Sequence, residues 1–600
     1  MKFLLSLLFL LLVIMTTTAQ HFSIEYSLSM SNPSTHLFEA AMQLNDLPSS
    51  KTVEVKMAAW RTGRYAILDF AGMVQEFSAT NEKKEILPWK KIDKETWSVE
   101  KKGAKHIIIR YNVYANEFNM RTRELNSEHA FLDPLAVFMY TEQTKNNPLQ
   151  LTITPYGNWH VTTGLEQSKD HPLVFTAPNF EYFGDCPIEI GNQFDKEFFV
   201  EGKKHLISIY GEGNWNADTL VKDFTAIIKA NLTFWGALPY NQYIFFLHCQ
   251  PNAGGGTEHI NSTVMGVRPF VFEKRSSYLN FLGLVSHEYF HTWNVKQLRP
   301  KAFAPYDFSK ENYTEELWLS EGGTSYLDNL ILIYAGIEKA DSYLAQIPSM
   351  AANEKSRYGN SVQPLSESSF DAWIKFWRNR ENALNAQSDY YGKGAQFSLL
   401  LDLELRHRSK NNTSLQKVMR TMFEQFPKTK GFINSDFQKM CEKLSGVSLE
   451  RFFKQYLYGT TPLPWKENLF YAGLELFIKD SSAKKIDAGL LLSSNNGKTI
   501  VGNVAPGSPA ERAGIEINDE LLALNGFRTS SVDFNERISS YKSGDTLQVV
   551  LFRNDKIKEI SLTLFEFGVS EYGIKKAEHP SELQKTIYES WLQTKWSESE

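Results

Sequence analysis

The chain of 600 residues is longer than one hydrophobic core usually organises, and its 22 % charged and 13 % aromatic residues are typical of folded domains, so we expect several domains. The formal net charge of -5 and the lack of a Lys/Arg run interleaved with aromatic residues argue against binding to nucleic acid or to anionic lipid. Three cysteines, Cys186, Cys249 and Cys441, are too few for a disulfide framework or a cysteine-based zinc site, although one disulfide is allowed.

The first residues predict export. Lys2 precedes an apolar run from Phe3 to Met15, and a small polar stretch follows up to Ala19, which is typical of a cleaved signal peptide. The run is shorter than the roughly 20 residues that a membrane span needs, and no later run matches it. We therefore expect residues 1–19 to be removed and the mature protein to be periplasmic or extracellular, with no membrane span.

Residues 20–198 predict a β-rich N-terminal domain. Short runs such as TVEVKMAAW and HIIIRYNVYA alternate apolar and polar residues and are separated by turn formers, as in a mainly antiparallel sheet. This stretch contains no motif of recognisable chemistry.

Residues 199–465 predict a second domain, in which helical periodicity dominates beyond Ser276. Its run FLGLVSHEYFHTWNV contains His287, Glu288 and His291 among apolar residues at helical spacing. Side chains four positions apart share a helix face, so both imidazoles can reach one zinc ion while Glu288 projects beside it. Zinc lowers the pKa of bound water to about 7 and polarises a carbonyl, and a neighbouring carboxylate then acts as general base. A chance match, or two structural core histidines, is the alternative.

A catalytic zinc has three protein ligands and one open position, so we expect a third ligand downstream. Glu321 lies in the segment ELWLSEGGTSYLDN, in an otherwise apolar helix-forming context where an unpaired carboxylate is costly. Glu315 and Glu316 are competing ligands, but their stretch is polar and expected to be exposed. A glutamate at the surface or at a helix start is the less favoured alternative for Glu321.

Two further segments flank these residues. Upstream, PNAGGGTEHINST contains three glycines, Gly254 to Gly256, that allow close backbone approach, and Glu258 follows them. Downstream, SDYYGKGAQF places Tyr390 and Tyr391 just before a long amphipathic helix. Each segment alone is weak evidence, because a glycine triplet is commonly a turn and a tyrosine pair commonly packs in a core.

The set GGGTEH, SHEYFHTWNVKQLRP, WLSEGGTSY and YYGKG, in this order, resembles the glycyl aminopeptidase family of gluzincin metallopeptidases. The resemblance spans about residues 20–567. It implies a multidomain α+β fold with a β-rich N-terminal domain, a thermolysin-like, mainly helical zinc peptidase domain and a C-terminal PDZ domain.

The resemblance also implies roles for the matched residues. His287, His291 and Glu321 would hold one Zn²⁺ per chain, and Glu288 would be the general base. Tyr391, at the Tyr-x-Lys-Gly position shared with the aminopeptidase N family, would hydrogen-bond the oxyanion of the tetrahedral intermediate.

Substrate recognition follows from the same comparison. Glu258 takes the place of the glutamate of the Gly-x-Met-Glu-Asn motif and would bind the free α-amino group, beside the backbone of Gly255 and Gly256. Thr257 and His259 depart from the family pattern, since Met and Asn stand there in the aminopeptidase N family. The shape of the amine pocket is therefore left open.

The C-terminal part begins after a predicted domain boundary in GTTPLPWKENLF, and residues 470–567 resemble a PDZ domain of the bacterial protease type. Gly489, Leu490, Leu491 and Leu492 would form the loop whose N–H groups hold the carboxylate of a peptide C-terminus, while the peptide adds as a strand. A docking module without a peptide ligand is the alternative. Residues 568–600 are expected to form a helical tail.

The resemblance implies a secreted aminopeptidase that hydrolyses the N-terminal bond of peptides and prefers Gly or Ala at that position. A thermolysin-like metalloendopeptidase is one alternative, and it would not need Glu258 to bind an amine. A catalytically inactive scaffold that presents peptides through its PDZ domain is another, and it would need neither Glu288 nor Tyr391.

Overall fold

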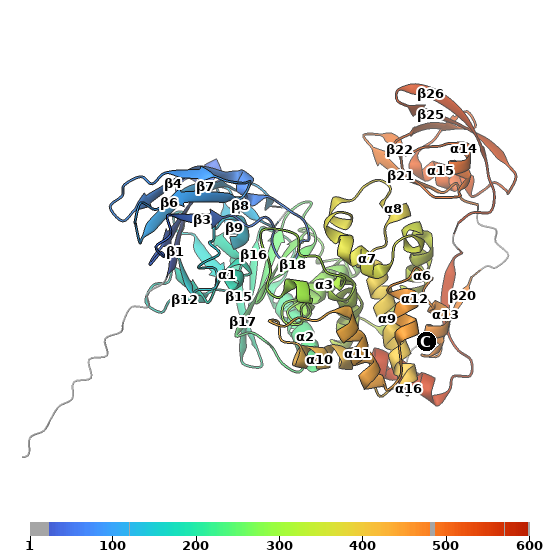
Figure 1. The fold of residues 1–600 in the computed structure, drawn as a ribbon. Helices are drawn as coiled ribbons and strands as arrows, with labels where there is room; N and C mark the ends of the chain where they lie inside the picture. Colours follow the sequence, from blue (N-terminus) through green and yellow to red (C-terminus); the bar gives the residue numbers. More distant parts are fainter. Residues whose placement is uncertain (1–22, 119–120, 480–485, 569, 598–600) are drawn as a thin grey trace, which may run out of the picture.

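The computed structural model describes residues 23–118, 121–479, 486–568 and 570–597. A β-rich N-terminal region, a mainly helical middle region and a C-terminal β module (residues 486–564) follow one another, and the module stands apart from the rest (Figure 1). This arrangement confirms the predicted multidomain α+β fold. The predicted signal peptide lies outside the described residues, and no helix within them is long and apolar enough to cross a bilayer.

The described residues of the N-terminal region form three sheets, and strands such as β2 bury every second residue, as the pattern predicts. The largest sheet has the order β12-β13-β10-β1-β2-β7-β4, in which only β1 and β10 pair in parallel. Its strands are β1 (Ile24–Ser29), β2 (Leu37–Leu44), β4 (Val74–Asn81), β7 (Ile107–Tyr114), β10 (Leu149–Thr154), β12 (Glu166–Gln167) and β13 (Val174–Ala177). The two smaller sheets consist of β3 (Thr52–Lys56), β6 (Thr96–Glu100) and β5 (Trp89–Lys91), and of β11 (His160–Thr163), β14 (Ile188–Gly191), β9 (His129–Leu132) and β8 (Arg123–Leu125).

The middle region combines one sheet of order β15-β16-β17-β19-β18 with a helical layer. The predicted boundary at residues 198–199 falls inside β15, which pairs with β16 and so belongs to this sheet. The strands are β15 (Phe194–Val200), β16 (Lys203–Tyr210), β17 (Gln242–Cys249), β18 (Gly256–Glu258) and β19 (Ser262–Val267). The helices are α2 (Ala217–Trp235), α3 (Arg275–Phe290), α4 (Thr324–Tyr334), α5 (Ala340–Leu344), α6 (Ile347–Ser356), α7 (Leu365–Phe370), α8 (Ala383–Ala386), α9 (Gly392–Arg408), α10 (Leu415–Gln425), α11 (Asn434–Ser445), α12 (Glu450–Tyr456) and α13 (Trp465–Phe470).

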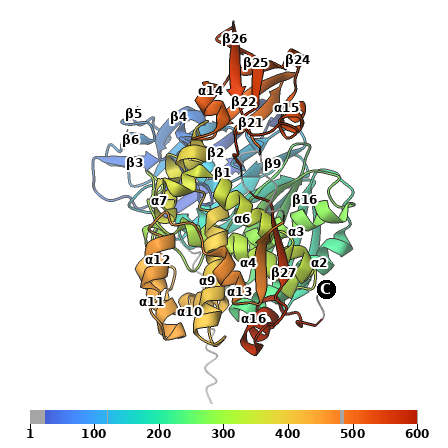
Figure 2. The same ribbon diagram turned by 90° about the vertical axis from the view of Figure 1, so that its right-hand side faces the viewer.

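Helix α9 is the central element of the helical layer. It is buried along most of its length and packs against α4, α10, α11 and α13 (Figure 2). The predicted domain boundary in GTTPLPWKENLF is therefore placed too early, because α13 belongs to the main core. Trp465 and Leu469 are buried there, and Asn468 Nδ2 donates to Leu400 O at 2.7 Å.

The C-terminal β module has a hydrophobic core of its own, built around Val501, Leu521, Phe534 and Leu551. Its elements are β21 (Leu490–Asn495), β22 (Lys498–Val504), α14 (Pro509–Ala513), β23 (Glu520–Leu524), β24 (Phe527–Arg528), α15 (Ser531–Ile538), β25 (Thr546–Arg553) and β26 (Lys556–Thr563). Few polar contacts join it to the middle region; Asn385 Nδ2 donates to Val504 O at 2.9 Å, for instance.

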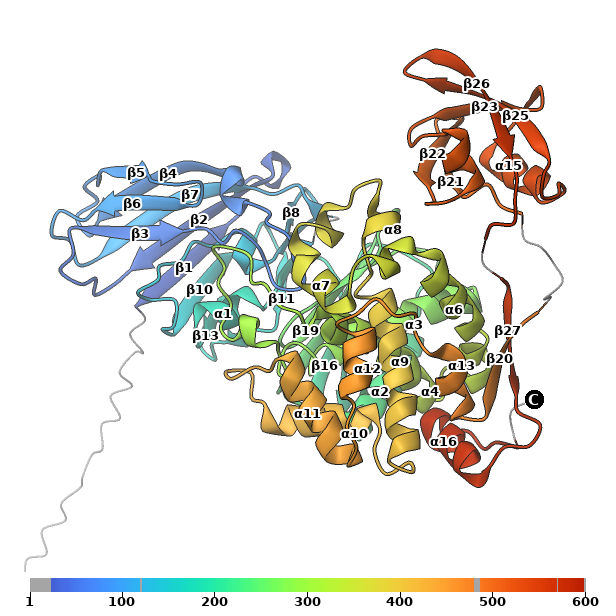
Figure 3. The same ribbon diagram turned by 45° about the vertical axis from the view of Figure 1, so that its right-hand side comes forward.

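Two strands outside this module, β20 (Leu474–Ile478) and β27 (Tyr572–Lys576), pair antiparallel and lie side by side beneath it (Figure 3). The predicted helical tail thus contains a strand, and among its described residues α16 (Glu582–Leu592) is the one helix. The register could not be predicted because the partner strands are separated by the whole module.

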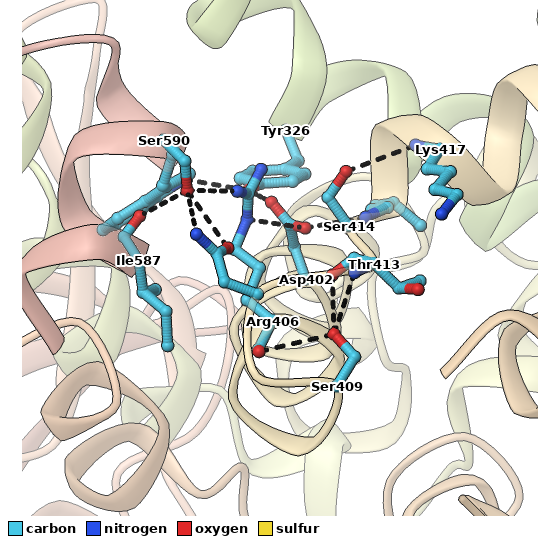
Figure 4. Close-up of polar contacts among 12 residues, drawn as sticks. Tyr326, Asp402, Arg406, Ser409, Thr413, Ser414, Lys417, Ile587 and Ser590 are labelled. Atoms are coloured by element: carbon cyan, nitrogen blue, oxygen red, sulfur yellow. Dashed lines mark hydrogen bonds and ion pairs between the residues drawn. The ribbon is translucent and has the colours of Figure 1, made fainter. Parts of the chain in front are cut away.

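Helix α16 is fastened to α9 and α4 by a polar network (Figure 4). Arg406 Nη1 donates to Ser590 Oγ at 2.9 Å, and Asp402 accepts from Arg406 Nε at 3.1 Å and from the Tyr326 hydroxyl at 2.6 Å. The indole of Trp591 donates to Tyr326 at 3.0 Å. Because Asp402 also accepts from the backbone N–H of Leu415, its carboxylate joins α4, α9 and α10, and its partners Arg406 and Tyr326 extend the network to α16.

We expect Trp591→Ala to destabilise the middle region by about 3–5 kcal/mol, since it removes a fully buried indole and leaves Tyr326 without one partner. Chemical unfolding followed by tryptophan fluorescence measures this loss. Thr586→Ala is the matched control, because Thr586 lies on the exposed face of the same helix. Equal unfolding midpoints for the two variants would show that the packing of α16 does not stabilise the middle region.

Candidate metal centre and active site

Helix α3 presents the two predicted imidazoles to one point. His287 lies in its last turn and His291 directly follows its end, and their Nε2 atoms are 3.1 Å apart. Their opposite ring nitrogens are held in place: Nδ1 of His287 is 2.9 Å from Asp328 Oδ2, and Nδ1 of His291 is 2.8 Å from the carbonyl oxygen of Asn294. Such partners fix the ring orientation and leave Nε2 free for a metal.

Glu321 meets this pair from a π-helical segment, Trp318–Gly323, that leads into α4. Its Oε2 lies 3.3 Å from His291 Nε2 and 3.8 Å from His287 Nε2, and the side chain is 3 % exposed. Burial alone would raise the pKa of Glu321, but the two imidazoles outweigh it and hold the pKa well below its usual range. Two imidazole nitrogens and one carboxylate oxygen that converge in this way fit the donor set of a catalytic zinc.

The two competing glutamates do not reach this point. Glu316 is buried, contrary to the expected exposure, and its carboxylate accepts hydrogen bonds from Thr314 and from the backbone N–H of Asn434 instead. Glu315 is exposed. The structure therefore brings Glu321, and neither competitor, to the histidines.

Glu288 lies beside the predicted ligands in a cavity of about 450 Å³. Burial raises the pKa of Glu288 to about 7, although the charges of His287 and His291 act in the opposite direction. A methyl group added at Gly256 would lie 2.3 Å from Glu288 Oε1, so the strand passes this carboxylate as closely as only glycine permits.

Glu258, on the same strand β18, is 4 % exposed, and one of its oxygens lies within 4.8 Å of ligand atoms of Glu288 and His291. Within the described part of the chain its carboxylate accepts no hydrogen bond. A buried carboxylate with unused acceptors at the wall of a cavity is suited to receive a cation.

The two neighbouring tyrosines have different surroundings. Tyr391 lines the cavity, and its ring centroid lies 6.5 Å from that of His287. Tyr390 is fully buried behind it and accepts a hydrogen bond from Trp377 Nε1 at 3.0 Å. Of the two tyrosines, Tyr391 therefore lies at the cavity wall, and its role as the oxyanion donor stays a prediction.

The N-terminal region, in which the sequence shows no motif, contributes directly to the site. The Tyr65 hydroxyl donates to Glu321 Oε1 at 3.0 Å, across a sequence separation of 256 residues. Arg61, Arg64 and Arg121 line the same cavity. No local signal marks these residues, because a strand pattern does not tell which loop will reach a distant helix.

A buried ion pair fixes the N-terminal region against the end of α3. Lys296, fully buried, donates to Asp185 Oδ1 at 2.8 Å and to Thr62 Oγ1 at 3.1 Å. His259 Nδ1 lies 3.2 Å from the same Asp185 oxygen. Burial would raise the pKa of Asp185, but Lys296 and His259 hold it at about 2. His259, which departs from the family pattern, thus anchors the strand that carries Glu258.

The predicted carboxylate loop of the C-terminal module differs from expectation in two ways. Leu490, Leu491 and Leu492 lie in β21, an edge strand, rather than in a loop. The N–H of Gly489 already donates to Asp487 Oδ1 at 2.7 Å. The free edge of β21 is available for strand addition, while a carboxylate would have to displace Asp487 to use the N–H of Gly489.

The sequence is similar to three protein families. The family model of the peptidase M61 N-terminal domain matches residues 25–192, that of the M61 glycyl aminopeptidase matches residues 280–397, and that of the PDZ domain matches residues 487–564. The PDZ match coincides with the C-terminal β module.

The chain is also similar to individual proteins of known structure or sequence. The crystal structure of an aminopeptidase N family protein from Idiomarina loihiensis superposes with a TM-score of 0.87 at 28 % identity, over 95 % of this chain and 100 % of that one. A predicted zinc metalloprotease of Clostridium perfringens is 28 % identical over 24 % of this chain, and one of Campylobacter jejuni is 38 % identical over 10 %. The chain spans 43 % and 16 % of these two relatives. By its N-terminal and catalytic domains, the chain belongs to the M61 glycyl aminopeptidase family of zinc metallopeptidases, and it also carries a PDZ domain.

Proposed function

We propose that the protein is an exported zinc aminopeptidase that binds one zinc ion per chain and releases small N-terminal residues from peptides. The observation that carries this proposal is the position of Glu258, a buried carboxylate without a hydrogen bond in the described chain, beside Glu288 and His291. An α-ammonium paired with Glu258 lies one residue from the bond to be cleaved. This spacing favours removal of a single residue over internal cleavage.

His287, His291 and Glu321 would hold the ion, which supplies Lewis-acid polarisation of the scissile carbonyl and acidifies water. Glu288 then takes the proton of the attacking water and passes it to the leaving amine. The Tyr391 hydroxyl donates to the oxygen on which negative charge develops. Tyr65 and Asp328 orient Glu321 and His287 through the hydrogen bonds described above.

The preference for Gly or Ala rests on the resemblance to the glycyl aminopeptidase family. A methyl group added at Gly63 would lie 2.6 Å from Glu258 Oε2 and 2.9 Å from Thr257 Cγ2, so Gly63 packs closely against the residue proposed to bind the amine. Export rests on the N-terminal apolar run, which lies outside the described residues.

The purified protein should contain close to one zinc per chain and lose hydrolysis of alanine p-nitroanilide to a chelator. Glu321→Ala should lower the zinc content, whereas Glu315→Gln, a change at a nearby exposed glutamate, should leave it unchanged. Metal analysis of the wild type and both variants gives the answer. Full activity in a protein stripped of metal would refute the proposed chemistry.

Tyr391→Phe should lower kcat by about 10²- to 10³-fold with little change in KM, because the hydroxyl contacts the oxyanion that forms in the transition state. Tyr390→Phe removes the same atom from the adjacent buried ring and should keep most of the activity. Steady-state kinetics of both variants decide between the two neighbours, and the opposite ranking would assign the role to Tyr390.

Glu258→Gln should weaken the use of free-amine peptides by roughly 1.5–3 kcal/mol in kcat/KM, the size of one charge-assisted hydrogen bond. N-acetylated peptides should be poor substrates of the wild type and should change little in the variant. Circular dichroism and zinc content control for folding. Efficient cleavage of acetylated peptides by the wild type would instead establish an endopeptidase.

A further inference from the structure

Two arginines of the N-terminal domain, Arg64 and Arg121, line the catalytic cavity without an anionic partner. Neither forms an ion pair within 4.0 Å among the described residues. The proposed mechanism uses neither residue. A zinc peptidase that needs only to hold an ammonium group has no evident reason to place guanidinium groups in its cavity.

Arg121 is fixed against the strand that leads to Glu258. Its Nη1 donates to the carbonyl oxygen of Gly254 at 2.9 Å and its Nε donates to Thr257 Oγ1 at 3.0 Å. A methyl group added at Gly255 would lie 3.5 Å from Nη2, and this nitrogen makes no hydrogen bond within the described chain. The guanidinium is thus anchored on one side, and its unused donor lies over Gly255.

Arg64 is held on the aromatic wall of the cavity. Its Cζ lies 5.0 Å from the ring centroid of Trp377, and its buried Nε has no acceptor within the described residues. Burial lowers the pKa of Arg121 to about 10, and the positive charges of Arg61 and Arg64 add to this effect. Guanidinium groups that repel one another in one cavity are stabilised when an anion binds between them.

Neutralisation of the catalytic glutamates does not account for Arg64, and it leaves one donor nitrogen of Arg121 unused. Arg61 is the more deeply buried arginine, and the charges of Glu258 and Glu288 act on it and, beyond ion-pair distance, on Arg121 as well. Arg64 and Arg121 form no close ion pair with either carboxylate in the described structure. Their free donors therefore remain available to a ligand.

The spacing along strand β18 indicates which ligand. Gly255 lies three positions before Glu258 and directly precedes β18, so the chain between them spans at most about 10 Å at the rise of a strand. An extended peptide of two or three residues spans roughly 7–10 Å between its termini. Gly256, opposite Glu288, lies between the two ends. The proposed amine-binding residue, the general base and the arginines therefore lie in the same order as the N-terminus, the first peptide bond and the C-terminus of a short peptide.

We infer that the cavity recognises both ends of its substrate, with Glu258 binding the α-ammonium and Arg121 and Arg64 binding the C-terminal α-carboxylate of a dipeptide or tripeptide. This inference rests on the proposed aminopeptidase function and adds a class of substrate to it. A longer peptide continues past the arginines and loses the carboxylate contact. The chain would then be a late enzyme of protein breakdown that acts on fragments made by other peptidases.

The test compares Ala-Ala-Ala with its C-terminal amide as substrates of the wild-type zinc enzyme. Loss of one charge-assisted contact should lower kcat/KM for the amide by about ten- to a hundredfold. Equal kcat/KM for both peptides would overturn the inference and leave the aminopeptidase function intact. No cleavage of either peptide by zinc-loaded protein would count against the proposed function itself.

Substitutions then locate the effect. In Arg121→Gln and Arg64→Gln the ratio of kcat/KM between the free and amidated peptides should fall towards one, whereas Arg110→Gln, at an exposed arginine of β7 in the same domain, should keep the wild-type ratio. An unchanged ratio in both cavity variants would overturn the assignment. Ala-Asp-Ala amide distinguishes the source of the carboxylate: if it is cleaved as well as the free tripeptide, the arginines bind an acidic side chain and the α-carboxylate assignment is wrong.

Discussion

The buried carboxylate of Glu321 requires the surrounding residues to supply positive charge and hydrogen-bond donors. A charge with so little contact with water is costly unless partners surround it. Here two imidazoles and the Tyr65 hydroxyl supply them, and they come from the end of α3 and from a loop of the N-terminal domain. The surroundings of Glu321 are therefore complete only when both domains are folded against each other.

The N-terminal domain is accordingly a part of the active site and not a separate binding module. The Lys296–Asp185 ion pair is also buried between the two domains. Removal of either residue would leave the charge of the other without a partner. His259 joins this junction to strand β18. The position of Glu258 relative to the metal site is thus fixed from two directions.

The residues of the site that could be predicted from the sequence are those whose positions depend on local spacing along the chain. Residues four apart on a helix fixed the relation of His287 to His291, and an apolar setting distinguished Glu321 from its neighbours. Asp328, two helical turns after Glu321, could have been proposed from the same periodicity. Tyr65, Arg64 and Arg121 could not, because their place in the site depends on the docking of a β domain whose loops carry no pattern of their own. The pairing of β20 with β27 was missed for a similar reason.

That pairing has a consequence for how the PDZ domain is attached. Ile478 and Tyr572 are cross-strand neighbours, so the chain leaves the catalytic domain and returns to it at almost the same spot, within roughly 5.5 Å. The PDZ domain is thus inserted between two paired strands, β20 and β27, that pack on the catalytic domain. The PDZ domain could therefore be exchanged or deleted by joining β20 to β27 with a tight turn, and α16 would keep its position. Both ends of the inserted domain are thereby tied to one place on the catalytic domain, and the hydrogen bond from Asn385 to Val504 adds a contact at a second place.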